Sequence, residues 1–123
     1  MTLTEYQNKV KDLSVYKDTL PGEEPLIAQF IFSPKDIMYT VLGLTGEAGE
    51  VANQVKKYIR DDRFVWTNER LAKVEDELGD VLWYLAAVCN ELHFSFEAVM
   101  EHNIAKLDKR KAKGTLKGDQ RIE

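Results

Sequence analysis

The sequence predicts an all-α protein with a four-helix, bundle-like arrangement, and three observations support this fold class. Apolar residues recur at helical spacing in four segments, and no segment shows a competing strand pattern. Serine or threonine stands where each helix would begin. The 123 residues are enough for one modest core and too few for two. We therefore expect one all-α domain spanning residues 1–123.

The first helix is expected to begin after Thr2 or Thr4 and to run to about Asp18. Pro21-Gly22 should end it, because neither residue favours a continuing helix. Residues 23–33 lack a regular period but contain several apolar side chains, so we expect an irregular segment that folds over the bundle.

The second helix is expected over about residues 34–60, with Ser33 as its N-cap and proline at its first position. Thr67 should cap a third helix that lasts to about Leu92. Ser95 should cap the fourth helix, which ends in a basic tail.

One acidic pattern occurs twice, once on the second expected helix and once on the third. The two copies are Glu47-Ala-Gly-Glu50-Val51 and Glu77-Leu-Gly-Asp80-Val81. The two acids of each copy are about 60° apart around a helix and lie beside its apolar stripe. If the two helices pack antiparallel, the four carboxylates should converge at the edge of their interface.

Four carboxylates so close together must hold protons at raised pKa or bind a cation. Oxygen ligands favour Mg²⁺ or Mn²⁺ over zinc. A di-iron site usually needs Glu-x-x-His, but the residues three before His93 and His102 are Asn90 and Val99. The predicted metal ligands are Glu47, Glu50, Glu77 and Asp80.

The alternative is a solvated helix face, because 21 acidic residues among 123 produce many such pairs by chance. The metal site is favoured by the duplication in register and by the glycine that precedes the second acid of each pair. Glycine inside a helix costs about 1 kcal/mol relative to alanine. Gly49 and Gly79 are therefore expected to serve close helix approach or ligand access, although packing alone could also explain them.

Composition narrows the functional classes. A net charge of −4 argues against a general nucleic-acid binder, and the single cysteine, Cys89, allows no internal disulfide. The longest apolar run, residues 81–89, is too short for a membrane span, and the N-terminal residues lack a signal-peptide pattern. We expect a cytoplasmic protein with neither nucleic-acid nor membrane partners.

These residues resemble the MazG-like, all-α nucleoside triphosphate pyrophosphohydrolases, whose pattern is Glu-x-x-Glu, a variable spacer and Glu-x-x-Asp. The spacer here is residues 51–76. Tyr84 follows Asp80 by one turn, and the segment from Asn103 through Lys106 to Arg110 is similar to the family's Asn-x-x-Lys-x-x-x-Arg helix. The expected core is residues 36–110. The basic tail, residues 111–123, departs from the usual family ending and could close over phosphate or be solvated.

The resemblance implies conversion of a nucleoside triphosphate to its monophosphate and pyrophosphate with Mg²⁺ bound by the four acids, often to remove surplus or noncanonical nucleotides. Glu47 is our candidate for the base that accepts a proton from water. Broad apolar helix faces suggest a homodimer or homotetramer, with Trp83 in its interface. The candidate substrate-binding residues are Lys57, Tyr84, Asn103, Lys106 and Arg110.

Several alternatives remain open from sequence. The lysines and arginine could be solvated helix residues, and Tyr84 could be a residue at the edge of the core. The enzyme could instead resemble the all-α dUTPases or the phosphoribosyl-ATP pyrophosphohydrolases, which share parts of this pattern. A non-catalytic, nucleotide-binding helical bundle is the alternative from another class. The base and the sugar are not predicted.

Overall fold

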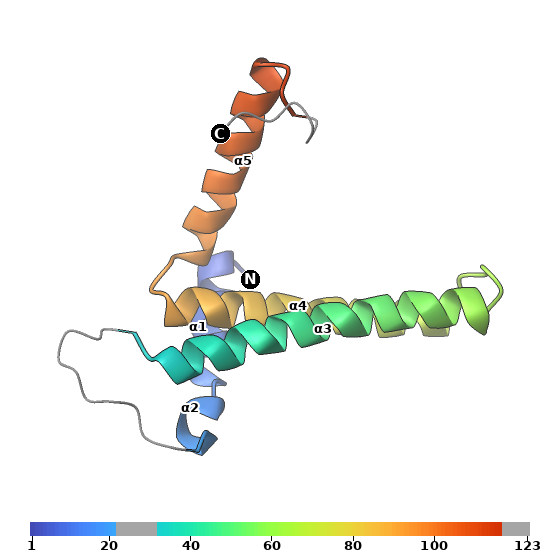
Figure 1. Ribbon diagram of the computed structural model, residues 1–123, viewed down its shortest axis with the longest axis horizontal. Coiled ribbons are helices and arrows are strands. Elements are labelled where there is room, and N and C mark those ends of the chain that lie inside the picture. Colours follow the sequence, from blue (N-terminus) through green and yellow to red (C-terminus); the bar gives the residue numbers. More distant parts are fainter. Residues whose placement is uncertain (22–31, 117–123) are drawn as a thin grey trace.

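The computed structural model describes residues 1–21 and 32–116, and the regular structure within these ranges is entirely helical (Figure 1). The elements are α1 (Leu3–Asp12), α2 (Tyr16–Thr19), α3 (Pro34–Arg60), α4 (Asn68–Glu91) and α5 (Phe96–Ala112). Helices α3 and α4 form a long antiparallel hairpin, and α1 crosses the end where α4 finishes. From this same end α5 points away from the hairpin. The all-α fold class and its four long helices are confirmed.

Each long helix begins at a side-chain cap. Thr2 accepts a hydrogen bond from the backbone N–H of Glu5, and the Glu5 carboxylate accepts one from the N–H of Thr2. The predicted caps Ser33, Thr67 and Ser95 each accept a hydrogen bond from the backbone N–H three residues further on. These bonds satisfy donors that the helix itself leaves free, so they fix where α3, α4 and α5 start.

The prediction of one continuous helix to about Asp18 is wrong, because the chain breaks between α1 and α2. The hydroxyl of Ser14 donates to the carbonyl of Val10 at 2.6 Å, and the N–H of Leu13 is shared between two carbonyls. The backbone N–H groups of Ser14 and Val15 then bond to the carbonyls of Lys11 and Leu13 and not to those four residues back, which ends the helix. Val10 and Tyr16 are nevertheless both buried, so the apolar period continues across the break.

The buried core lies where α1, α4 and the start of α5 meet. Its members are Val10, Ala86, Ala87, Cys89 and Phe96. Burial raises the pKa of the Cys89 thiol, as expected for an ordinary core cysteine.

Trp83 packs within its own chain, and its predicted place in an oligomer interface stays a prediction. Its ring is half-buried, packs against the core and makes an edge contact with Tyr16 at 6.5 Å. α1 and α2 cover this side of α4 within the same chain, which the helical wheel of α4 alone could not reveal.

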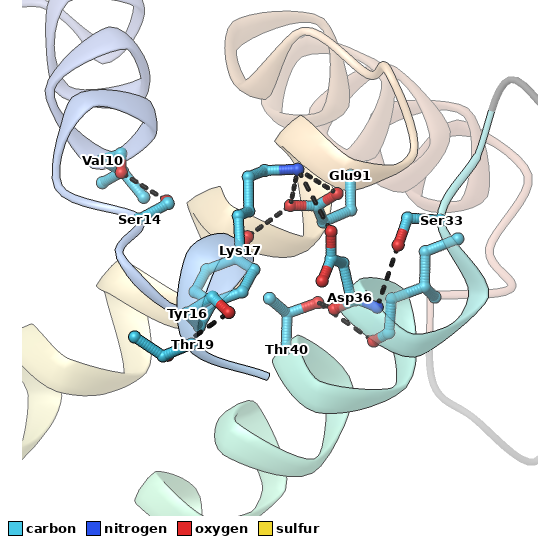
Figure 2. A network of polar contacts seen from close by, with 10 residues as sticks. Val10, Ser14, Tyr16, Lys17, Thr19, Ser33, Asp36, Thr40 and Glu91 are labelled. Atoms are coloured by element: carbon cyan, nitrogen blue, oxygen red, sulfur yellow. Dashed lines mark hydrogen bonds and ion pairs between the residues drawn. The ribbon is translucent and has the colours of Figure 1, made fainter. Parts of the chain in front are cut away.

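A polar network joins α2 to the hairpin (Figure 2). The ammonium of Lys17 lies 2.8 Å from a carboxylate oxygen of Glu91 and 3.4 Å from one of Asp36. Glu91 is 4% exposed and also accepts a hydrogen bond from the Tyr16 hydroxyl. Burial alone would lower the pKa of Lys17, but Glu91 and Asp36 raise it. The network therefore holds the start of α3 and the end of α4 against α2.

Much apolar surface on the long helices is uncovered in this single chain. The larger exposed apolar side chains of α3, α4 and α5 are Met38, Val41, Leu42, Val55, Ile59, Leu71, Leu78, Leu82, Val99, Met100 and Ile104. The segment predicted to fold over the bundle lies almost wholly outside the described residues. Among the described helices, none combines the length and apolar character that crossing a membrane requires.

Candidate metal centre

Three of the four repeated acids meet midway along the hairpin. Glu47 comes from α3, and Glu77 and Asp80 come from α4. One carboxylate oxygen from each lies within 4.8 Å of the other two. Glu47 and Glu77 are half-buried, whereas Asp80 is exposed. The antiparallel packing of α3 and α4 thus brings the two copies of the pattern together.

Glu50, the fourth acid, is exposed and lies outside this close group. It is nevertheless near enough for its charge to help raise the pKa of Glu47. Glu50 is therefore at the margin of the site, one turn along α3 from the three converging carboxylates.

The electrostatics of the cluster favour a cation. Partial burial raises the pKa of Glu47, and the charges of Asp80, Glu77 and Glu50 raise it further, together with a hydrogen bond to Glu77. A proton on Glu47 relieves part of this repulsion, and a divalent ion would relieve more. The donor set contains only carboxylate oxygens, which suits Mg²⁺ or Mn²⁺.

The raised pKa of Glu47 predicts a pH-dependent stability in the metal-free protein. A carboxyl whose pKa is higher in the folded state binds more protons there than in the unfolded chain. The contribution of Glu47 to stability should therefore fall as the pH rises from 4.5, the ordinary pKa of this carboxyl group, through its raised pKa. Thermal melts without metal should show this loss across that window, and Glu47→Gln should reduce it. A Glu47→Gln variant with the same pH dependence as the parent would contradict the prediction.

Tyr84 lies beside the acids and covers Gly43. A Cβ atom added at Gly43 would lie 2.2 Å from Cε1 of Tyr84, so the ring occupies the place of a side chain. Burial raises the pKa of Tyr84, a hydrogen bond with Tyr39 raises it further, and the charges of Glu47 and Asp80 add to the shift. The phenol at the edge of the site therefore stays protonated at neutral pH.

The expectation that Gly49 and Gly79 allow close helix approach is wrong. An added Cβ at either position would meet no described atom within 4 Å. Both glycines face open space, and the close contact of α3 with α4 occurs at Gly43 instead. The role in ligand access stays a prediction.

Lys57 lies further along α3, near the turn of the hairpin. It is ten residues from Glu47, or about 15 Å along the helix axis. Its charge contributes to the lowered pKa of Asp61, after the larger effects of Arg60 and the charge of Arg70. The structure thus places Lys57 with the turn and not with the three converging acids.

Asn103, Lys106 and Arg110 all lie on α5, which points away from the hairpin (Figure 1). Lys106 is about 15 Å along α5 from its start, and Asp80 is about 16 Å along α4 from its end. These three predicted phosphate-binding residues therefore do not reach the acids of their own chain. Asn103 and Lys106 instead line a separate cavity of about 630 Å³ beside the α4–α5 turn.

Two tyrosines near the acids, Tyr6 and Tyr39, were missed by the sequence reasoning. The charge of Asp80 adds to the effect of burial in raising the pKa of Tyr6 on α1. Tyr39 contacts Tyr84, with their ring centroids 6.5 Å apart. One signal was available: Tyr39, Gly43 and Glu47 are spaced by four residues and share a helix face.

Comparison with known proteins identifies the family. Residues 36–115 match the family described as the MazG nucleotide pyrophosphohydrolase domain. The chain is also 39% identical over 113 residues to the "Gene 37 protein" of Mycobacterium phage L5, covering 92% of this chain and 91% of that protein. No solved structure matches significantly. The chain belongs to the MazG nucleotide pyrophosphohydrolase family, as the repeated acids and the α5 residues suggested.

Proposed function

We propose that this protein hydrolyses a (d)NTP to the (d)NMP and pyrophosphate in a reaction that depends on Mg²⁺, or on Mn²⁺ in its place. The observation that carries the proposal is the convergence of Glu47, Glu77 and Asp80 in a chain of the MazG family. The single domain would act in the cytoplasm on surplus or noncanonical nucleotides.

The residues of the cluster have distinct tasks in this proposal. Glu77 and Asp80 hold the metal together with Glu47, and Glu50 supports them from the margin. When bound, Mg²⁺ would offset the charge of the triphosphate and activate water. Glu47, with its raised pKa, is the best placed to accept the proton of the attacking water. Attack at the α-phosphorus leaves pyrophosphate as the departing group.

The site also needs groups that hold the phosphates, and a second copy of the chain is our proposed source. α5 carries Asn103, Lys106 and Arg110 away from its own hairpin, while apolar side chains of the hairpin and of α5 are uncovered. Packing α5 of one copy along the hairpin of another would bury both surfaces. It would also place cations near carboxylates and bound phosphate. The proposed assembly is a homodimer or a homotetramer built from such pairs.

Co-expression of two inactive variants tests this arrangement. Glu77→Gln removes a metal ligand, and Lys106→Ala removes an α5 cation. In a mixed dimer one site would combine both defects and the other would contain neither. Random pairing should therefore restore about a quarter of the parental activity, because half of the dimers are mixed and each has one intact site. If acids and α5 came from the same copy, the mixture would stay as inactive as the separate variants.

Product analysis tests the reaction itself. A panel of standard and modified (d)NTPs is incubated with Mg²⁺, with Mn²⁺ or with EDTA, and pyrophosphate and orthophosphate are measured separately. The proposal expects metal-dependent pyrophosphate and monophosphate in equal amounts. The panel should include dUTP and phosphoribosyl-ATP, which test the two related enzyme classes. Nucleotide binding without turnover by any member of the panel would favour the non-catalytic bundle.

A further inference from the structure

The cavity beside the turn between α4 and α5 has the size and the charge of a site for a small anion. Its volume is about 630 Å³, and proteins commonly bind small organic ligands in cavities of about 300–1,000 Å³. Among the described residues, none of those that line it is acidic, although the protein as a whole has a net charge of −4. A negatively charged ligand therefore meets no like charge in the lining.

The chemistry of the lining changes along α5. At the end further from the turn lie Asn103 and Lys106, an amide and a cation. Towards the turn the wall becomes apolar, with Ala98 and Val99 on α5 and Phe94 in the turn itself. Val99 and Lys106 are seven residues apart on one face of the helix, or about 10 Å along its axis. A ligand that spans the cavity thus needs an anionic group at one end and an apolar group at the other.

The two histidines of the chain, His93 and His102, both line this cavity. His102 is one helical turn from Lys106 and adds a hydrogen-bonding ring near the anionic end. His93 lies in the turn next to Phe94, so two aromatic rings border the apolar end. Aromatic side chains of this kind stack on nucleobases.

The turn that carries His93 is held in one conformation. His93 has a φ of 60°, which is strained for a non-glycine residue and persists only where the surroundings hold it. The backbone N–H of Phe94 donates to the carbonyl of Cys89 at 2.8 Å, and the side-chain amide of Gln7 donates to the carbonyl of Phe94 at 2.7 Å. The ring of Phe32 makes an edge contact with that of His93, with centroids 5.1 Å apart. The apolar end of the cavity is therefore preformed.

We propose that this cavity binds the nucleoside end of the substrate, with the base at the turn and the phosphates directed past Lys106. A nucleotide combines the two features that the lining requires, an anionic end and an aromatic end. The base lies against Phe94 and Val99, within reach of the imidazole of His93. The inference rests on the proposed function, in which α5 delivers Asn103 and Lys106 to the phosphates held at the acids of a second copy.

The two imidazoles provide a test that does not depend on turnover. Proton NMR at constant pH follows their Cε1 protons, which are assigned by the loss of one signal in His93→Asn and of the other in His102→Gln. Asparagine is chosen at position 93 because it tolerates a positive φ. A dNTP analogue with an imido group between the α- and β-phosphorus, added with Mg²⁺, should shift both signals. Inorganic tripolyphosphate with Mg²⁺ lacks the nucleoside and should shift only the signal of His102.

Filling the cavity provides a kinetic test. Ala98→Trp places a large ring in the cavity from an exposed position of α5. The KM for each cleaved dNTP should rise at least about tenfold, as expected when a pocket no longer fits its ligand. The value of kcat should stay within about twofold, because the acids are untouched. Ala112→Trp is the matched control, since Ala112 is the exposed last residue of α5 and does not line the cavity, and its KM should stay within about twofold of the parent.

Each outcome has a distinct meaning. Shifts of both imidazole signals with the analogue, a shift of His102 alone with tripolyphosphate and a raised KM in Ala98→Trp support the inference. A His93 signal that does not move at saturating analogue overturns it, and so does a His93 shift of equal size with tripolyphosphate. An unchanged KM in Ala98→Trp, or equal effects of Ala98→Trp and Ala112→Trp, also overturn it. If the parent protein releases no pyrophosphate, the proposed function fails, and the NMR titration still decides whether the cavity binds the nucleoside.

Discussion

Asp80→Asn is expected to reduce metal-dependent pyrophosphate release at least about 10²-fold, because a metal ligand contributes several kcal/mol to stabilising the transition state. The folded protein should be as stable as the parent or more stable. Asp80 is exposed and helps to raise the pKa of Glu47, so removing its charge relieves repulsion in the metal-free cluster. Steady-state kinetics and thermal melts of the same preparation measure both effects.

Glu75→Gln is the matched control for this substitution. Glu75 is an exposed acid of α4 and does not belong to the converging group. The Glu75→Gln variant should retain parental activity. The comparison thus separates the loss of a metal ligand from the loss of any one negative charge on α4. An Asp80→Asn variant as active as Glu75→Gln would contradict the assignment of Asp80 to the metal.

The largest expected effect on stability comes from Glu91→Ala. The buried carboxylate of Glu91 holds Lys17 and accepts a hydrogen bond from the Tyr16 hydroxyl. The substitution therefore leaves the buried hydroxyl of Tyr16 without its partner. Lys17 is 42% exposed and can turn to solvent, which limits the cost of separating the pair. We expect a loss of about 3 kcal/mol in the free energy of unfolding.

Urea denaturation of Glu91→Ala measures this loss, and Glu69→Ala is its control. Glu69 forms an exposed pair with Lys73 at 3.5 Å on α4, so its removal should change stability by less than about 0.5 kcal/mol. Similar losses in the two variants would show that the buried network does not anchor α2 to the hairpin.

The helix starts of the hairpin were predictable because they depend on local chemistry. Ser33 and Thr67 cap α3 and α4 through hydrogen bonds that span three residues, and the acids beside the apolar stripe imply which faces meet. The end of the first helix was not predictable from its period. The backbone hydrogen bonds leave the helical pattern at Ser14 and Val15, while the apolar pattern continues through Tyr16.

The features that sequence reasoning missed depend on contacts between helices. Gly43 and Tyr84 are far apart in the sequence, and their contact follows from the register of the hairpin. Trp83 turned out to be covered by α1 and α2, a side that its own helix could not indicate. The direction of α5 is set by the turn after α4, where the backbone N–H of Phe94 donates to the carbonyl of Cys89. The side-chain amide of Gln7 on α1 holds this turn, because it donates to the carbonyl of Phe94 and accepts from the backbone N–H of Phe96.

Hydrolysis in ¹⁸O-labelled water, followed by mass spectrometry of both products, shows which phosphorus the water attacks. We expect the label in the nucleoside monophosphate, because water attacks the α-phosphorus and the β- and γ-phosphates depart together. Label in pyrophosphate would place the attack at the β-phosphorus. Label in orthophosphate, with a nucleoside diphosphate as the other product, would place it at the γ-phosphorus, and either result would contradict the proposed reaction.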